Sequence, residues 1–263
     1  MKRGIIILSA LLLVIVATIP AAGCRADTGD SETIVVTHSI LGSIVKELVG
    51  NSASVTVLMP NGVDPHDWEP SAHDIQNLNN AELIIWNGLG LEVSIEGAVN
   101  SAVNKGVKLF TATNHIEIRH IDDEEGAPDP HFWLDPLAMK SVVTSLSAEL
   151  RTTLNINTDT RARALEIRLD DLHNNIVSIV SNITPADRKL VTGHDSMGYF
   201  AQRYGFQLIG SVVPNLSTQA GVSAADIAVL IAQIKEYNVK AIFVESGTSV
   251  GMVQQISNAT GAA

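Results

Sequence analysis

Short apolar runs alternate with segments of helical periodicity through the first half of this chain. The runs are rich in Val, Ile and Leu, as strands are, and they lie at residues 33–37, 54–59, 83–86 and 107–110. Segments with a helical pattern lie between them, at residues 39–49, 71–81 and 92–104. Ser71 and Asp74 have the spacing of a capping box at the start of the second of these helices. Strands that alternate with helices predict right-handed crossovers, and hence a mostly parallel sheet with helices on both faces.

The same alternation returns after Pro185. Strands are predicted at residues 189–192, 207–213 and 239–244, and helices at residues 196–204, 223–237 and 249–259. Ser223 and Asp226 form a second capping box. Gly261 marks the end of the last helix, after which we expect a further strand, so we interpret the C-terminal lobe as truncated.

A long stretch without predicted strands separates the two halves. Residues 111–136 contain an acidic patch and several prolines, which predicts a long surface loop. Residues 159–183 carry the longest helical pattern, in which Leu165, Leu172 and Ile179 recur on one face. We interpret this helix as a stiff connector, although an ordinary packed helix explains the periodicity equally well. The predicted parts are an N-terminal α/β lobe over residues 33–157 that ends in a helix at 137–152, a connector helix over 158–184 and an incomplete C-terminal α/β lobe over 185–263.

The N-terminus predicts export. Residues 1–23 have a basic start, an apolar run and small residues before Cys24, as a secretory signal peptide does, and the run is too short for a comfortable transmembrane helix. The segment AAGC at 21–24 resembles the bacterial lipobox, in which the Cys becomes the lipidated first residue, with Ala21 in place of the usual Leu. Ordinary cleavage that leaves a free Cys24 is the alternative. Residues 24–32 are polar and small, and we expect a flexible tether.

Composition excludes several classes of protein. Of 263 residues, 46% are hydrophobic and 17% are charged, which is enough apolar material for a packed core and rules out a mainly disordered chain. The formal net charge of -11 and the aromatic content of 4% provide neither the basic stripe nor the stacking rings of a nucleic-acid-binding protein. Cys24 is the only cysteine, so an intramolecular disulfide and a Cys-based zinc site are both excluded.

Three of the eight histidines follow predicted strands or stiffened loops, where α/β sheets bind ligands. His66 and His131 each lie in the pattern Asp-Pro-His-x-Trp, and His194 follows the strand at 189–192. Proline restricts the backbone before each of the first two histidines, and the Trp that follows could exclude water. Imidazole is the commonest zinc ligand, so the three side chains predict a metal site assembled by folding. Three nearby acids are candidates to orient the imidazoles: Asp67, Asp135 and Asp195.

The other histidines carry less chemical signal. His73 and His173 lie on predicted helices, and we expect both to be solvated. His38 ends the first strand and could line a cleft, but we do not expect it to bind metal. His115 and His120 lie in the acid-containing loop before His131, for which solubility is the simplest explanation.

The combined motifs resemble one family: the metal-binding receptors of bacterial zinc and manganese ABC transporters, which are zinc-uptake and adhesin-like solute-binding lipoproteins. The matching segments, in chain order, are AAGC at 21–24, VDPHDWEPS at 63–71, NGLGLE at 87–92, DPHFWLDP at 129–136, HDSMGYFAQRY at 194–204 and FVES at 243–246. The likeness covers essentially the whole mature chain. It implies two α/β lobes joined by one long rigid helix, with the metal held between them.

The resemblance also implies a ligand set. It assigns the metal to His66, His131 and His194, and a His at the third position is typical of zinc receptors, whereas manganese receptors often have Glu there. The softer imidazole therefore favours Zn²⁺ and leaves Mn²⁺ as an alternative. The fourth ligand of the family, usually an Asp, would come from beyond residue 263. Glu245 is the nearest carboxylate in this lobe, and we do not expect it to be a ligand.

The implied function is extracytoplasmic metal capture without catalysis. The protein would be lipid-anchored to the bacterial cell membrane, bind Zn²⁺ as a monomer, and pass it to an ABC permease whose ATPase lies on the cytoplasmic side. A Mn²⁺ or Fe²⁺ receptor of the same family, a receptor for a larger chelate, and a zinc-dependent hydrolase are the alternatives. Against the hydrolase, the chain has no His-Glu-x-x-His motif, and His194 takes the place of the first glycine that a Gly-x-Ser-x-Gly elbow around Ser196 would need.

Overall fold

The computed structural model of the protein describes residues 33–121, 126–245 and 248–263. The predicted signal peptide at 1–23, the lipidation site Cys24 and the tether at 24–32 lie outside these residues. Within the described part of the chain, none of the helices has the length and apolar character needed to cross a membrane.

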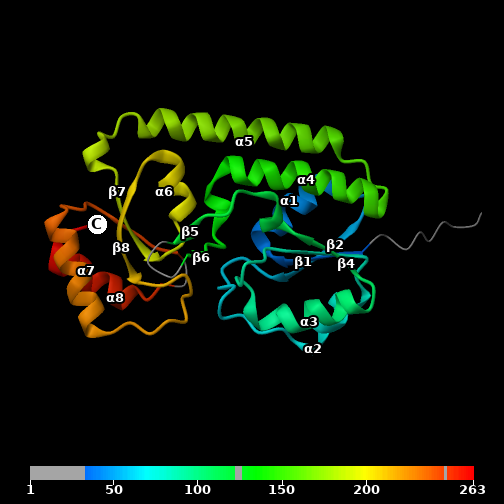
Figure 1. The fold of residues 1–263 in the computed structure, drawn as a ribbon, viewed down its shortest axis with the longest axis horizontal. Coiled ribbons are helices and arrows are strands. Elements are labelled where there is room, and N and C mark those ends of the chain that lie inside the picture. Colours follow the sequence, from blue (N-terminus) through cyan, green and yellow to red (C-terminus); the bar gives the residue numbers. More distant parts are fainter. Residues whose placement is uncertain (1–32, 122–125, 246–247) are drawn as a thin grey trace, which may run out of the picture. The chain divides into compact units, whose positions relative to one another are not determined.

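The first lobe is a four-stranded parallel sheet of strand order β2-β1-β3-β4 (Figure 1). Its strands are β1 (Thr33–His38), β2 (Ser54–Met59), β3 (Leu83–Trp86) and β4 (Lys108–Thr111). Its helices are α1 (Ser39–Val49), α2 (Ala72–Asn80) and α3 (Val93–Asn104). Side chains alternate across the sheet, so Val36 packs toward α1 and α4 while its neighbour Val35 packs toward α2 and α3. The strands and helices predicted for this half are confirmed.

The second lobe is a three-stranded parallel sheet of order β8-β7-β9. Its strands are β7 (Lys189–His194), β8 (Gln207–Val213) and β9 (Ile242–Phe243), and its helices are α6 (Gly198–Tyr204), α7 (Ala224–Glu236) and α8 (Val250–Thr260). β9 has two paired residues, which is fewer than the apolar run at 239–244 predicts. The truncation of this lobe stays a prediction.

Two long helices lie between the two sheets along the chain, α4 (Pro136–Leu154) and α5 (Asp159–Val180). The buried apolar side chains of α4 belong to the core of the first lobe, and α5 runs on to the second lobe (Figure 1). The start of α5 packs on the first lobe through Leu165, which is 3% exposed. Further along, its apolar side chains line a cavity of about 640 Å³ beside the second lobe. The apolar row predicted on one face is not buried along its whole length, because Leu172 and Ile179 are 47% and 66% exposed. The helix therefore packs on both lobes, but only through part of its apolar row. The predicted boundaries between the connector helix and the two lobes, at 157/158 and 184/185, stay predictions.

The segment expected to be a long surface loop is partly buried. It forms a short antiparallel pair, β5 (His120–Ile121) with β6 (Ala127–Pro128), and a 3₁₀-helix at Phe132–Leu134. Asp129 and Phe132 that follow the pair are fully buried. Burial at this point was missed because the prolines and acids around it favour a surface position. His131 lies in this segment and is buried with it.

Candidate metal centre

Three imidazoles from distant parts of the chain converge on one point. His66 lies in the loop after β2, His131 follows the β5–β6 pair, and His194 is the last residue of β7. The Nε2 atom of His131 lies 3.1 Å from Nε2 of His66 and 3.2 Å from Nε2 of His194. One ion bound tetrahedrally at about 2.0–2.1 Å would separate its imidazole nitrogens by about 3.4 Å. The three side chains predicted from the sequence are therefore spaced so that a single metal ion can contact all of them.

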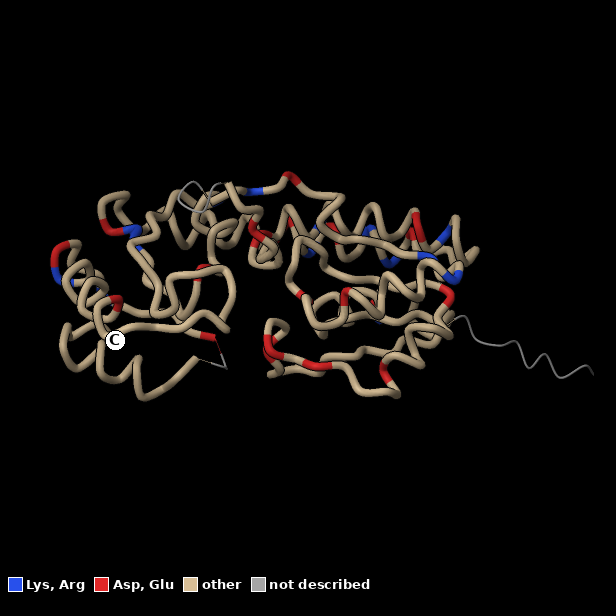
Figure 2. The backbone as a smooth tube through the Cα atoms, turned by 60° about the horizontal axis from the view of Figure 1, so that its bottom comes forward, with Lys and Arg blue, Asp and Glu red and all other residues tan. Residues whose placement is uncertain are grey.

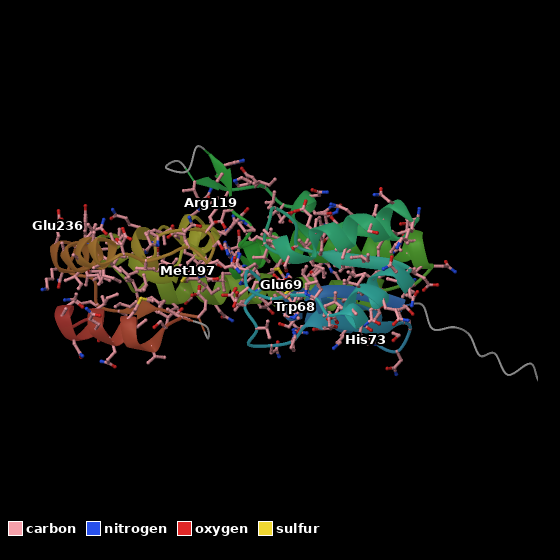
Figure 3. All side chains as sticks on the ribbon, turned by 90° about the horizontal axis from the view of Figure 1, so that it is seen from below. Trp68, Glu69, His73, Arg119, Met197 and Glu236 are labelled. Carbon is pink, nitrogen blue, oxygen red and sulfur yellow. The ribbon has the colours of Figure 1, made fainter. Side chains whose placement is uncertain are left out.

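The walls around the imidazoles form a cavity of about 220 Å³. Besides the three histidines, the side chains that line it include Val63, Pro65, Trp133, Leu134, Ser196, Thr218, Glu245 and Thr248. Trp133 thus has the position expected for excluding water. The same expectation is wrong for Trp68, which packs instead on the apolar cluster beneath α2 and α3 (Figure 3).

A buried carboxylate orients His131. Asp129 Oδ1 accepts hydrogen bonds from the backbone N–H of His131 at 2.9 Å and from its ring Nδ1 at 2.9 Å. The other carboxylate oxygen accepts from the Arg119 guanidinium at 3.0 Å, and Asp129 is 0% exposed. A proton fixed on Nδ1 leaves the Nε2 lone pair free, and Nε2 is the atom that faces the other two rings.

A second carboxylate does the same for His194. Glu245 Oε2 lies 3.4 Å from Nδ1 of His194, and Ser196 Oγ donates to the other oxygen of Glu245. Burial alone would raise the pKa of Glu245, but the hydrogen bonds from His194 and Ser196 outweigh it and lower that pKa to about 2. Glu245 is therefore an anion on the wall of the cavity.

Burial favours the neutral form of two of the three rings, those of His66 and His131. Burial, followed by the nearby His131 ring, lowers the pKa of His66 to about 4. Burial is also the main reason why the pKa of His131 is lowered. Only neutral imidazole can donate a lone pair to a metal, so the lowered pKa values favour the binding form at neutral pH.

The acids expected to orient the imidazoles have other partners. Asp67 accepts from Gln219 Nε2 at 3.1 Å, Asp195 accepts from Ser211 Oγ at 2.6 Å, and Asp135 is paired with the guanidinium of Arg203. The residues that orient histidines were missed for two reasons. Asp129 belongs to the Asp-Pro-His-x-Trp motif itself. In both copies of the motif the Asp carboxylate accepts a hydrogen bond at 2.9 Å from the backbone N–H of the His two residues later, Asp129 from His131 and Asp64 from His66. This local turn was a signal that could have been used. Glu245 lies 51 positions after its histidine, and no local pattern connects them.

The remaining histidines lie elsewhere. His38 is 6% exposed, with its ring 6.0 Å from that of Trp133. His73 is exposed, as expected. The expectation is wrong for His173, which is half-buried with Nδ1 3.2 Å from the Tyr204 hydroxyl. His115 stacks on the Phe110 ring at 4.5 Å.

With this geometry established, comparison with known proteins identifies the family. Residues 34–263 match the family model described as ZnuA, zinc-uptake complex component A periplasmic. The chain belongs to this family. Its members are metal-binding receptors for transport and not enzymes, so the predicted recognition and the absence of catalysis are confirmed at the level of the family.

Characterised relatives of the ZnuA family cover most of the chain. The zinc-binding protein TroA of Treponema pallidum is 32% identical over 91% of this chain and 78% of its own length. The manganese-binding lipoprotein MntA of Halalkalibacterium halodurans is 29% identical over 95% of this chain and 84% of its own. The solved structure of the TroA protein superposes with a TM-score of 0.78 at 30% identity, and it covers 88% of this chain and 84% of that one. The chain is thus an extracytoplasmic metal-binding receptor of the ABC-transporter class, with the two-lobe α/β fold predicted for it.

Proposed function

We propose that the protein captures Zn²⁺ outside the cytoplasmic membrane, with His66, His131 and His194 as ligands, and delivers it to an ABC permease. The observation that carries the proposal is the convergence of three Nε2 atoms at 3.1 and 3.2 Å, from the buried rings of His131 and His194 and the half-buried ring of His66. A third imidazole, in place of a carboxylate, makes the site softer and favours Zn²⁺ over Mn²⁺. The similarity to a relative named for zinc supports this choice, whereas the similarity to MntA makes Mn²⁺ the competing cargo.

The charges around the site suit a divalent cation that must later leave. Three neutral imidazoles leave the full charge of the ion uncompensated. The acidic residues that line the cavity are Asp64 and Glu245, and the Glu245 side chain is 43% exposed. The other orienting carboxylate, Asp129, is already paired with Arg119. Acidic positions are spread over both lobes, and the net charge of -11 favours the approach of cations (Figure 2).

The proposal includes the placement of the chain in the cell. Residues 1–23 would direct export, lipidated Cys24 would anchor the protein to the bacterial membrane, and residues 24–32 would tether the folded body. The body would act as a monomer whose lobes are residues 33–157 and 185–263, on either side of a connector helix. Its partner would be a permease that draws on an ATPase in the cytoplasm.

Calorimetry under chelator competition tests the metal site. We expect His66→Ala, His131→Ala and His194→Ala each to weaken Zn²⁺ binding strongly, while His73→Ala, which changes an exposed histidine on α2, keeps the wild-type affinity. Equal affinity in the wild type and the triple variant would end the proposal. Competition between Zn²⁺ and Mn²⁺ on the wild type then decides the cargo, and a preference for Mn²⁺ would overturn the choice of zinc while leaving the ligands in place.

A further inference from the structure

One helix of the second lobe holds the segment that carries His131 at both ends. Tyr199 and Arg203 are four residues apart on α6, so their side chains leave the same face of the helix. Tyr199 contacts the segment at Asp129, and Arg203 contacts it at Asp135. Figure 1 shows α6 beside β5 and β6, the strands that lead into this segment.

The Tyr199 hydroxyl takes the place of a backbone hydrogen bond in the β5–β6 pair. His120 pairs with Pro128, so Arg119 and Asp129 form the next step of this antiparallel ladder. The Asp129 N–H donates to the Arg119 carbonyl at 2.8 Å, as a ladder requires. The return bond is replaced by a bridge, because the Arg119 N–H donates to Tyr199 Oη at 3.0 Å and that hydroxyl donates to the Asp129 carbonyl at 3.0 Å.

The Arg119 and Asp129 side chains meet at the same step of the ladder as this bridge. The two side chains form the ion pair at 3.0 Å whose carboxylate also holds His131 Nδ1. The pair lies against the start of α6, where a Cβ on Gly198 would come within 2.3 Å of Arg119 Nη1 and 2.6 Å of Asp129 Oδ2. The absence of a side chain at residue 198 therefore leaves room for the pair.

The packing around Tyr199 makes the contact specific. The residue is 5% exposed, and its ring belongs to the apolar cluster of the first lobe together with Phe132 and Ala138, although its helix belongs to the second lobe. At the other end, the Arg203 guanidinium contacts both oxygens of Asp135 at 2.7–3.1 Å, and Asp135 also caps α4 by accepting from the Leu137 N–H at 3.0 Å. Both ends of the ligand segment are thus fixed from the other lobe.

We propose that Tyr199 is a positioning residue for the metal ligand His131, through which the second lobe fixes the Arg119–Asp129 pair and with it the direction of the imidazole. The inference rests on the proposed function, since it assigns a role at the same site. It adds that the affinity for Zn²⁺ of a site that includes His131 of the first lobe depends on the Tyr199 hydroxyl of the second lobe, although this hydroxyl does not itself contact the metal.

The test compares two Tyr→Phe variants on the same helix. Tyr199→Phe removes the bridging hydroxyl. The matched control Tyr204→Phe changes a tyrosine that is also 5% exposed and removes a hydroxyl that contacts His173 on α5. Zn²⁺ affinity is measured by chelator competition, Tm by thermal unfolding, and the geometry at the metal by the visible absorption of bound Co²⁺ at saturation. We expect Tyr199→Phe to bind Zn²⁺ about 10-fold more weakly, as outer partners of ligands do, and to shift the Co²⁺ bands, while Tyr204→Phe changes neither.

Two further variants separate the possible outcomes. Gly198→Ala pushes a methyl group into the Arg119–Asp129 pair, and we expect it to weaken Zn²⁺ binding and shift the Co²⁺ bands in the same way as Tyr199→Phe. Wild-type affinity and wild-type Co²⁺ bands in Tyr199→Phe would overturn the inference. So would an equal loss of Zn²⁺ affinity in Tyr199→Phe and Tyr204→Phe that parallels a decrease in their Tm. His131→Ala tests the function separately: if it binds Zn²⁺ like the wild type, the proposed site itself is wrong, whatever the result for Tyr199.

Discussion

Protonation of His38 should destabilise the metal-free protein at mildly acidic pH. His38 is 6% exposed at the end of β1, and burial lowers its pKa from 6.5 to about 4, partly offset by its interaction with Asn87. The unfolded chain therefore binds a proton between these two pH values when the folded protein does not. The stability contributed by the neutral ring is complete above pH 6.5 and is lost progressively as the pH falls toward 4.

The size of this effect follows from the shift in pKa. The difference between 6.5 and about 4, at about 1.4 kcal/mol per unit, corresponds to about 3 kcal/mol in the free energy of unfolding. About 2 kcal/mol of this should be lost between pH 7 and pH 5. That is a large fraction of the stability of a typical protein, so the effect is measurable by urea unfolding.

The assay compares the wild type with His38→Gln, which has a similar size and does not titrate. Both are unfolded with urea at pH 7 and pH 5 in the presence of chelator, and His73→Gln controls for the loss of an exposed histidine. His66, whose pKa is also lowered, is present in all three proteins, so its contribution cancels in the comparison. We expect His38→Gln to lose about 2 kcal/mol less than the wild type between the two pH values. An equal loss in both would refute the assignment of this pH dependence to His38.

Three further predictions concern the site and a helix away from it. Asp129→Asn should weaken Zn²⁺ binding about 10–100-fold, because it removes the buried charge that holds His131 Nδ1, and an unchanged affinity in chelator competition would contradict this role. Glu245→Gln should have a smaller effect in the same assay, because the side chain is 43% exposed and water can replace part of its interaction with His194; a larger loss than in Asp129→Asn would reverse this order. Ser71→Ala removes the capping box of α2 and should cost about 1 kcal/mol in urea unfolding without changing Zn²⁺ affinity, and stability equal to the wild type would show that the cap contributes nothing.

Local patterns in the sequence were sufficient to predict most of the secondary structure. The capping boxes at Ser71 and Ser223 form as predicted, because a cap depends on residues only three positions apart. Apolar periodicity located the strands for the same reason, since burial on one face repeats within a few residues. The position of His66, His131 and His194 at loops near one edge of the sheets also followed from the order of strands and helices, together with the repeated Asp-Pro-His-x-Trp motif.

Errors in the prediction occur where a contact joins distant parts of the chain. Periodicity placed the apolar row of α5 on one face, but burial along that row depends on what lies opposite, so Leu165 is buried while Ile179 is exposed. Two copies of the same motif likewise gave two outcomes: Trp133 lines the cavity around the three imidazoles, and Trp68 packs away from it. Periodicity describes an element by itself and contains no information about its neighbours.

The sequence by itself therefore determined the elements, the family likeness and the three imidazoles. Only the tertiary structure decided how those imidazoles are held, because Glu245 reaches His194 from 51 positions away and Tyr199 reaches Asp129 from 70 positions away. A hydrogen bond depends on distances of a few ångströms that chain folding alone creates. No spacing along the chain indicates that a tyrosine hydroxyl will replace a backbone bond in a strand pair of the other lobe.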